Sequence, residues 1–386
     1  MNIQLLNKIA AIGTDKLDKT IYNVSADVEN PDAIMVRSAA MHDMEFGSEL
    51  KAIARAGAGV NNIPIDRCSK DGIVVFNTPG ANANGVKELA ICALLLASRD
   101  IVGGINWATS LIGTEGVAKA VEAGKSKFAG CEIAGKKLGI IGLGAIGGMV
   151  ADAATYLKMN VVGCDPYISV DAAWRLNQNV THAKNYEEIY KTCDYISLHV
   201  PATADTKNMI NKDSIAMMKD GVKIINLSRA DLVNAADIKE ALESGKVSAY
   251  VTDFPTEDIL GAKGVVAIPH LGASTEESED NCAVMAAVEL DNYLRYGIIK
   301  NSVNFPAVDM PMSAGIRVCV LHANVPAVLS QITTVFSTEG VNIENLVNKS
   351  KGDNAYTVLD IESGAEESII EKVKAISDVY KVRVIK

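Results

Sequence analysis

The sequence has no excess of basic residues. It contains 37 lysines and arginines against 47 aspartates and glutamates, which gives a formal net charge of −10. Nucleic acids and anionic membranes both bind to basic surfaces. We therefore expect neither a nucleic acid nor a membrane among the partners. A few arginines could still form a local site for an anionic substrate.

Long hydrophobic runs and paired cysteines are also missing. No uncharged apolar stretch reaches the roughly 18 residues of a membrane-spanning helix. The N-terminus lacks the pattern of a secretory signal. The seven cysteines are scattered and contain no C-x-x-C pair, so we expect no disulfide framework and no metal site. These absences predict a cytoplasmic protein.

What the sequence does contain is an alternation of short apolar runs with longer amphipathic stretches. The runs at 33–36, 136–142 and 222–228 are nearly all apolar, which is typical of parallel strands covered on both faces. Long helices are expected at 87–100 and 274–297. The pattern predicts an α/β fold with two Rossmann-like parallel-sheet lobes.

A different pattern starts at Ile316 and runs to the last residue. Its order is βαββαβ, which predicts a small α+β domain with helices on one face of its sheet. The length of 386 residues suits two or three domains. We expect a linker (307–315) and the C-terminal domain (316–386).

A glycine-rich turn follows the expected strand at 136–142 and opens a helix. Gly142, Gly144 and Gly147 have the G-x-G-x-x-G spacing, and Asp165 ends the next strand 21 residues after Gly144. This arrangement is typical of dinucleotide binding, because the helix N-terminus offers free N–H groups to the pyrophosphate. Asp165 would accept hydrogen bonds from a free ribose and repel a 2′-phosphate, which favours NAD over NADP.

Three polar residues follow apolar strands in the second half of the sequence. They are Arg229, Glu257 and His270. Oxidation of a hydroxy acid needs a base, a cation for the carboxylate and an acid that orients the base, and His270, Arg229 and Glu257 can fill these roles in that order. Taken singly, Arg229 could equally pair with a surface acid, and His270 could pack behind Pro269.

Six runs together resemble the D-2-hydroxyacid dehydrogenases: RAGAGVNNI, KKLGIIGLGAIG, SLHVPATADTKNMI, INLSRA, DFPTE and PHLGAST. The C-terminal pattern resembles an ACT domain. The combination resembles the members of that family that act on 3-phosphoglycerate, in the first committed step of L-serine synthesis. The resemblance implies a two-lobed enzyme with a discontinuous substrate lobe (1–88 and 274–306) and a cofactor domain (89–273). It also implies a homodimer or homotetramer, and a closure of the lobes that excludes water from hydride transfer.

The resemblance also implies roles for individual residues. Arg229, Glu257 and His270 become the catalytic trio, and Asp253 lies beside the nicotinamide amide. One residue fewer separates Asp253 from Glu257 than is usual in the family, so either can be displaced. The implied cofactor contacts are Gly142, Gly144, Ala145, Ile146, Gly147, Asp165, His199, Pro201, Thr206, Ser228, Asp253 and Gly272. The implied substrate contacts are Arg37 at the phosphate, Ser38, Gly57, Ala58, Gly59, Asn82, Lys87, Arg229 and His270.

The ACT-like domain implies a small amino-acid effector. By resemblance to serine-inhibited relatives, His322, Asn324 and Asn342 would contact L-serine. Ala327 stands where the family often has glycine and could narrow that site. A domain that only pairs two copies is the alternative.

Two other functions remain open. One is a glyoxylate or hydroxypyruvate reductase, against which Arg37 and the ACT-like domain argue. The other is a non-catalytic protein that senses NAD or serine, against which the intact trio argues.

Overall fold

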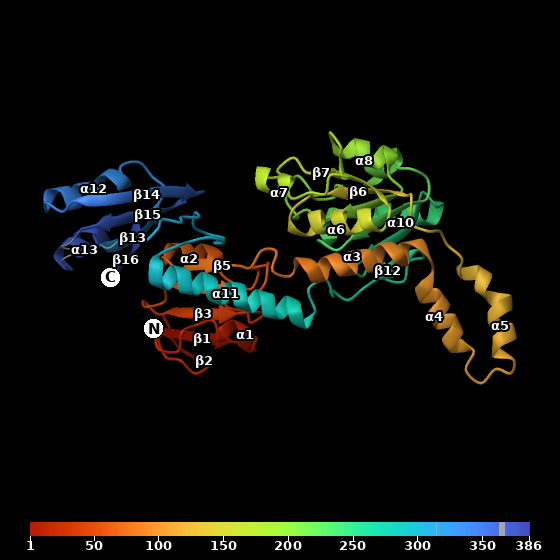
Figure 1. Cartoon of the computed structure of the whole chain (residues 1–386), viewed down its shortest axis with the longest axis horizontal. Helices are drawn as coiled ribbons and strands as arrows, with labels where there is room; N and C mark the ends of the chain where they lie inside the picture. The colour runs from red at the N-terminus through yellow and green to blue at the C-terminus, as the bar shows by residue number, and fades with distance from the viewer. Residues whose placement is uncertain (314, 363–366) are drawn as a thin grey trace. The chain divides into compact units, whose positions relative to one another are not determined.

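The computed structural model describes residues 1–313, 315–362 and 367–386. The chain forms two compact units, whose elements are labelled in Figure 1. The first unit joins Met1–Asn82 to Glu276–Lys386, and the second unit is Ala83–Thr275. Among the described residues, no helix combines the length and the apolar character needed to cross a membrane.

The first unit begins with a parallel five-stranded sheet in the order β2-β1-β3-β4-β5. The strands are β1 (Asn2–Leu6), β2 (Asn23–Ser25), β3 (Ala33–Val36), β4 (Ala52–Arg55) and β5 (Val74–Phe76). The helices of this part are α1 (Ala11–Thr14), α2 (Ile65–Lys70) and α11 (Glu276–Tyr296). Helix α11 covers one face of the sheet and α2 the other.

The first unit also contains an antiparallel four-stranded sheet in the order β14-β15-β13-β16. Its elements are β13 (Ile316–Ala323), α12 (Val328–Thr338), β14 (Ile343–Lys351), β15 (Asn354–Ile361), α13 (Glu367–Lys374) and β16 (Val379–Ile385). Helices α12 and α13 cover one face. The opposite face packs against the C-terminal end of α11, so this sheet shares a hydrophobic core with the first one.

The second unit is built on a parallel seven-stranded sheet in the order β12-β11-β10-β9-β6-β7-β8. The strands are β6 (Lys137–Ile141), β7 (Asn160–Cys164), β8 (Thr181–His182), β9 (Tyr195–Leu198), β10 (Val222–Asn226), β11 (Val247–Thr252) and β12 (Val265–Ala267). Helices α3 (Ala83–Ser98) and α6 (Ala145–Tyr156) cover one face. The helices α8 (Tyr186–Thr192), α9 (Lys212–Met217) and α10 (Ala235–Ser244) cover the other. The remaining helices are α4 (Ile101–Ser110), α5 (Val117–Gly124), α7 (Val170–Trp174) and the short 3₁₀ turns η1 (Lys125–Phe128) and η2 (Ala230–Leu232).

The predicted fold class is confirmed, and the ends of the two long helices differ from the prediction. The helix expected at 87–100 starts at Ala83 and stops at Ser98. It stops there because Asp100 caps the next helix, with its carboxylate accepting a hydrogen bond of 2.9 Å from the N–H of Gly103. The helix expected at 274–297 runs from Glu276 to Tyr296.

Candidate active site

The glycine-rich turn follows β6 and leads into α6, as the sequence predicts. Gly142 has a φ of +91°, and a Cβ atom there would lie 2.4 Å from the carbonyl oxygen of His199. A Cβ atom at Gly147 would lie 1.9 Å from the carbonyl oxygen of Gly142. Only glycine fits at these two positions. A Cβ atom at Gly144 would meet no atom within 4 Å, so the backbone is open to a ligand there.

The N-terminus of α6 has no side chain that caps it. Its N-cap residue is Gly144, and the N–H groups of Ala145 and Ile146 begin the helix. Four other helices of this unit, α4, α8, α9 and α10, are capped by an Asp or Asn side chain. An uncapped helix start after a tight glycine turn fits the pyrophosphate of a dinucleotide, because the first N–H groups and the helix dipole both favour an anion.

Asp165 lies beside this turn at the end of β7. Its Oδ2 accepts a hydrogen bond of 2.9 Å from the N–H of Leu143, and its Oδ1 accepts one of 2.9 Å from the N–H of Tyr167. These bonds fix the carboxylate against the glycine turn. The position fits the ribose of a dinucleotide.

His199 ends β9 on the other side of the turn. Its Nε2 is 2.8 Å from the hydroxyl of Ser197, and its buried Nδ1 has no partner among the described residues. Burial lowers the pKa of His199 to about 4, so the ring is neutral at pH 7. A neutral ring packed against the turn suits the cofactor contact that the family resemblance implies for His199.

Asp253 follows β11 and is 1% exposed. Its Oδ2 accepts a hydrogen bond of 3.1 Å from the N–H of Gly272, and its buried Oδ1 has no partner among the described residues. Burial raises the pKa of Asp253, while the Gly272 N–H and the nearby His270 oppose that rise. A buried oxygen without a donor fits an amide N–H such as that of nicotinamide.

Arg229 projects from a turn after β10 that Asn226 organises. The Oδ1 of Asn226 accepts a hydrogen bond from the N–H of Ser228 at 3.2 Å, and its Nδ2 donates to the carbonyl of Arg229 at 2.8 Å. The Ser228 hydroxyl donates to the carbonyl of Leu198 at 2.8 Å. No carboxylate pairs with Arg229 among the described residues, so the exposed guanidinium is available to an anion.

Phe254 brings Arg229 and His270 to one place. The guanidinium carbon of Arg229 lies 5.6 Å from the centre of the Phe254 ring. The His270 ring centre lies 4.5 Å from the same point. A cation and an imidazole that share one aromatic neighbour can act on the same small molecule.

The backbone of His270 is held in an unusual conformation. Its φ is +45°, and its N–H donates to the carbonyls of Asp253 at 2.9 Å and Ile268 at 3.0 Å. Such a φ is costly for a residue with a Cβ atom and is often found at functional sites. Within the described chain no hydrogen bond joins Glu257 to His270, and Glu257 is exposed. The role given to Glu257 therefore stays a prediction.

The first unit contains the expected substrate residues of the N-terminal part. Arg37 forms an ion pair of 2.7 Å with Glu279, near the start of α11. The Arg55 side chain donates to the carbonyl of Arg37 at 3.1 Å and lies over Gly57, where a Cβ atom would be 2.3 Å from it. Arg55 thus lies against Gly57, one of the expected substrate contacts.

Two asparagines support the backbone around these residues. The Oδ1 of Asn7 accepts hydrogen bonds from the N–H of Ser38 at 3.1 Å and of Ala39 at 2.7 Å. The Nδ2 of Asn77 donates to the carbonyl of Ala58 at 2.6 Å. No motif in the sequence pointed to Asn7 or Asn77.

The other expected contacts lie in simpler surroundings. Lys87, on α3, is 3.6 Å from the Glu88 carboxylate. The Thr206 hydroxyl donates to the carbonyl of Pro201 at 2.6 Å, which closes the loop after His199. Gly59 and Asn82 lie in the first unit.

Two parts of the chain match known protein domains. Residues 105–272 match the NAD-binding domain of the D-isomer specific 2-hydroxyacid dehydrogenases. Residues 318–381 match an ACT domain of the kind found in the small subunit of AHAS. The chain is 33% identical to the D-3-phosphoglycerate dehydrogenase of Escherichia coli K12 over 354 residues, which cover 87% of this chain and 82% of that protein.

The chain belongs to the D-3-phosphoglycerate dehydrogenase family.

Other members of the D-3-phosphoglycerate dehydrogenase family differ in length. The protein of that name from Methanocaldococcus jannaschii is 35% identical over 290 residues, or 73% of this chain and 53% of that protein. The chain thus spans about half the length of such relatives. A solved structure of NAD⁺-bound 3-phosphoglycerate dehydrogenase from Entamoeba histolytica has a TM-score of 0.62 and 27% identity, and it covers 79% of this chain and 98% of that one.

Membership of the D-3-phosphoglycerate dehydrogenase family identifies the second unit as an NAD-binding domain.

In the ACT domain, His322 is 3% exposed. Its Nδ1 is 2.8 Å from the carbonyl of Ala323, and its Nε2 is 2.8 Å from the hydroxyl of Thr357. The Asn324 amide donates to the carbonyl of Gly352 at 3.0 Å, and Asn342 is exposed.

Proposed function

We propose that the chain is an NAD-dependent enzyme that oxidises D-3-phosphoglycerate to 3-phosphohydroxypyruvate. The observation that carries the proposal is the contact of Arg229 and His270 with one ring, that of Phe254, in an NAD-binding domain. The names of the relatives support the choice of substrate.

In this reaction His270 takes the proton of the substrate hydroxyl, and Arg229 binds the substrate carboxylate. NAD, if held by the glycine turn at Gly142–Gly147, would supply the acceptor for the hydride that leaves the substrate carbon. Phe254 fixes the His270 ring, and the buried Asp253 supplies a carboxylate next to it. Asp253 thereby favours the protonated ring that forms when the hydroxyl loses its proton. The proposed role of Glu257, to orient His270, requires its exposed side chain to turn toward the ring.

The phosphate is assigned to Arg37. Because Arg37 is paired with Glu279, a substrate phosphate must take the place of that carboxylate. A dianionic phosphate competes better than a carboxylate for a guanidinium, which favours a phosphorylated substrate.

The test is reduction of phosphohydroxypyruvate by NADH, compared with hydroxypyruvate and glyoxylate. We expect a clear preference for the phosphorylated substrate and for NADH over NADPH. Arg37→Gln should raise KM for phosphohydroxypyruvate by about tenfold or more and leave KM for hydroxypyruvate unchanged. Equal use of the three acids would instead favour a glyoxylate or hydroxypyruvate reductase. NADH binding without turnover would favour a sensor.

We also propose the domain assignment drawn from the sequence, with substrate binding in 1–88 and 274–306 and cofactor binding in 89–273.

We further propose a homodimer or homotetramer, which the exposed apolar side chains of α4 and of the segment that follows it support. Ile105 is 60% exposed and Ile112 is 83% exposed, and α4 has no buried residue.

L-Serine is the proposed effector of the ACT domain, through His322, Asn324 and Asn342. The presence of an ACT domain supports it. Both ring nitrogens of His322 already have partners, so serine would have to replace one of them. The turnover assay with and without serine tests the proposal, and Asn342→Ala should weaken any inhibition. No effect of serine would leave the ACT domain with a pairing role.

A further inference from the structure

A pocket of about 600 Å³ lies in the first unit, and none of the expected cofactor or substrate residues lines it. The end of α11, strand β16 and Lys51, which precedes β4, contribute to its walls. Apart from the two chain ends, its charged lining consists of Lys51, Arg295 and Arg383, and no aspartate or glutamate side chain lines it. This lining is unusual in a chain with a net charge of −10.

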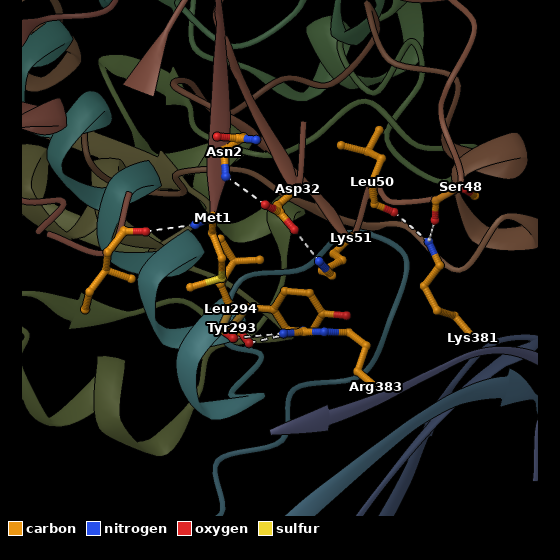
Figure 2. A network of polar contacts seen from close by, with 11 residues as sticks. Met1, Asn2, Asp32, Ser48, Leu50, Lys51, Tyr293, Leu294, Lys381 and Arg383 are labelled. Atoms are coloured by element: carbon orange, nitrogen blue, oxygen red, sulfur yellow. Dashed lines mark hydrogen bonds and ion pairs between the residues drawn. The ribbon is translucent and has the colours of Figure 1, made fainter. Parts of the chain in front are cut away.

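Arg383 carries a charge that no carboxylate offsets among the described residues. Its guanidinium donates to the carbonyls of Tyr293 at 3.2 Å and Leu294 at 2.9 Å, and it lies 4.3 Å from the centre of the Tyr293 ring (Figure 2). Carbonyl dipoles and a ring face stabilise a cation without neutralising it. The guanidinium therefore remains an anion-binding group at the wall of the pocket.

The neighbouring cations are close enough to affect one another. Lys381 donates to the carbonyls of Ser48 at 3.2 Å and Leu50 at 2.6 Å. Burial lowers the pKa of Lys381, and the charges of Lys51 and Arg383 lower it further. These three cations appear together in Figure 2.

The carboxylates near the pocket already have partners. Asp32 pairs with Lys51 and also accepts a hydrogen bond of 2.7 Å from the N–H of Asn2. Asp291 is 3.8 Å from Arg295 and accepts a hydrogen bond of 2.9 Å from the Tyr22 hydroxyl. The positive side of each pair faces the pocket, since the arginine and lysine line it and the aspartates do not.

We propose that this pocket binds a small phosphate-bearing anion between the ACT sheet and the N-terminal sheet. Arg383 belongs to the ACT domain, whereas Lys51 and Arg295 belong to the part built on β4 and α11. One anion that contacts all three would tie the two sheets together. Phosphate suits the site better than a monocarboxylate, because its nearly double negative charge and several oxygens can serve two guanidinium groups and an ammonium group at once.

The test follows the thermal unfolding of the full chain in rising inorganic phosphate at constant ionic strength. Saturating NADH is present so that the glycine turn is occupied. We expect phosphate to raise the midpoint, because a ligand that binds only the folded state stabilises it. Arg295→Gln should weaken the apparent phosphate affinity by about tenfold. Arg383→Lys should weaken it as well, because lysine keeps the charge but loses the planar fork.

Arg67→Gln is the matched control. Arg67 is 3.7 Å from Asp71 one turn away and lies over the Phe46 ring, just as Arg295 is 3.8 Å from Asp291 and lies over the Tyr296 ring. The two side chains are 40% and 37% exposed. Arg67→Gln should leave the response to phosphate unchanged, and an equal loss in both variants would overturn the proposal.

Two further arms separate this site from the proposed active site. Arg37→Gln should keep the response to phosphate even though it impairs turnover. If Arg37→Gln abolishes the response, phosphate acts at the substrate site and the proposed pocket site is wrong. If the site accepts phosphate monoesters, glycerol 2-phosphate should raise the midpoint as inorganic phosphate does. If the site selects the free ion, inorganic phosphate alone should raise it. Equal stabilisation by acetate would overturn the assignment to phosphate.

Discussion

His270 is the side chain on which the proposed chemistry most directly depends. His270→Asn keeps a polar side chain of similar reach but removes the base, so kcat should fall by about 10²- to 10⁴-fold. NADH binding, followed by fluorescence, should persist. His182→Asn is the control, because His182 is exposed on β8 in the same unit. Unchanged turnover in His270→Asn would remove His270 from the mechanism.

Glu289 is a buried carboxyl group that the proposed mechanism does not use. It is 5% exposed, and its Oε1 accepts a hydrogen bond of 2.6 Å from the Asn301 amide. Its Oε2 is buried without a partner among the described residues. Burial raises the pKa of Glu289 from an ordinary 4.5 to about 7. Between these two values the folded state holds a proton that the unfolded state has lost.

This difference makes stability depend on pH. The contribution of Glu289 is most favourable below pH 4.5 and is lost as the pH rises through 7. By pH 8 the loss amounts to as much as roughly 3 kcal/mol in the free energy of unfolding. Glu289→Gln should remove this loss, so the variant gains stability relative to the natural chain between pH 5 and pH 8. Urea unfolding of the natural chain and of the variant, at pH 5 and at pH 8, measures the free energies to be compared. Parallel pH dependences in the two proteins would contradict the prediction.

At the scale of single residues, spacing in the sequence was enough for the glycine turn and for Asp165, since both belong to a local strand-turn-helix unit. The sequence did not indicate Asn226 or Phe254. Asn226 acts by folding its amide back onto its own turn, and Phe254 acts by packing between two loops. Neither role requires a fixed spacing between residues, so no sequence motif marks it. The missing contact of Glu257 matches the shorter segment after Asp253.

At the scale of elements, the start of α12 carries a local strain. Ala327 is the N-cap residue and has a φ of +70°. An L-residue with a Cβ atom pays about 1 kcal/mol or more in this region, and glycine does not. Ala327→Gly should therefore raise the free energy of unfolding by about 1 kcal/mol. Gln331→Gly, inside the same helix, should lower it by about the same amount. Chemical unfolding of both variants checks the opposite signs.

The order of strands and helices could be predicted because each element has its own apolar period. The ends of the elements depended on neighbours. Asp100 caps the start of α4, and the helix before it ends earlier than predicted. The pairing of strands was predictable only as parallel or antiparallel, since the order in a sheet depends on contacts between distant segments.

At the scale of the whole molecule, the sequence predicts a separate ACT domain, whereas in the structure this domain forms one unit with the N-terminal sheet. A buried ion pair lies where the ACT sheet meets the rest of this unit. Arg317 binds Asp360 on the ACT sheet at 2.8 Å and donates to the carbonyls of Tyr296 and Met310, each at 2.8 Å. Gly297 lies where a Cβ atom would be 2.6 Å from the Sγ atom of Cys319. Such contacts between distant segments produce no periodic pattern in the sequence, so the sequence does not predict them.

The proposed oligomer gives the last prediction. Ile105, on α4, is 60% exposed, Ile112, in the segment after α4, is 83% exposed, and α4 has no buried residue. Replacing both by lysine should cost the folded monomer little, because no packing is lost, but should disrupt an interface by burying charge. Light scattering after size exclusion should show a smaller particle for Ile105→Lys/Ile112→Lys. Leu260→Lys, at a residue that is 57% exposed elsewhere in the second unit, should keep the natural mass. An unchanged mass in the double variant would move the interface away from this segment.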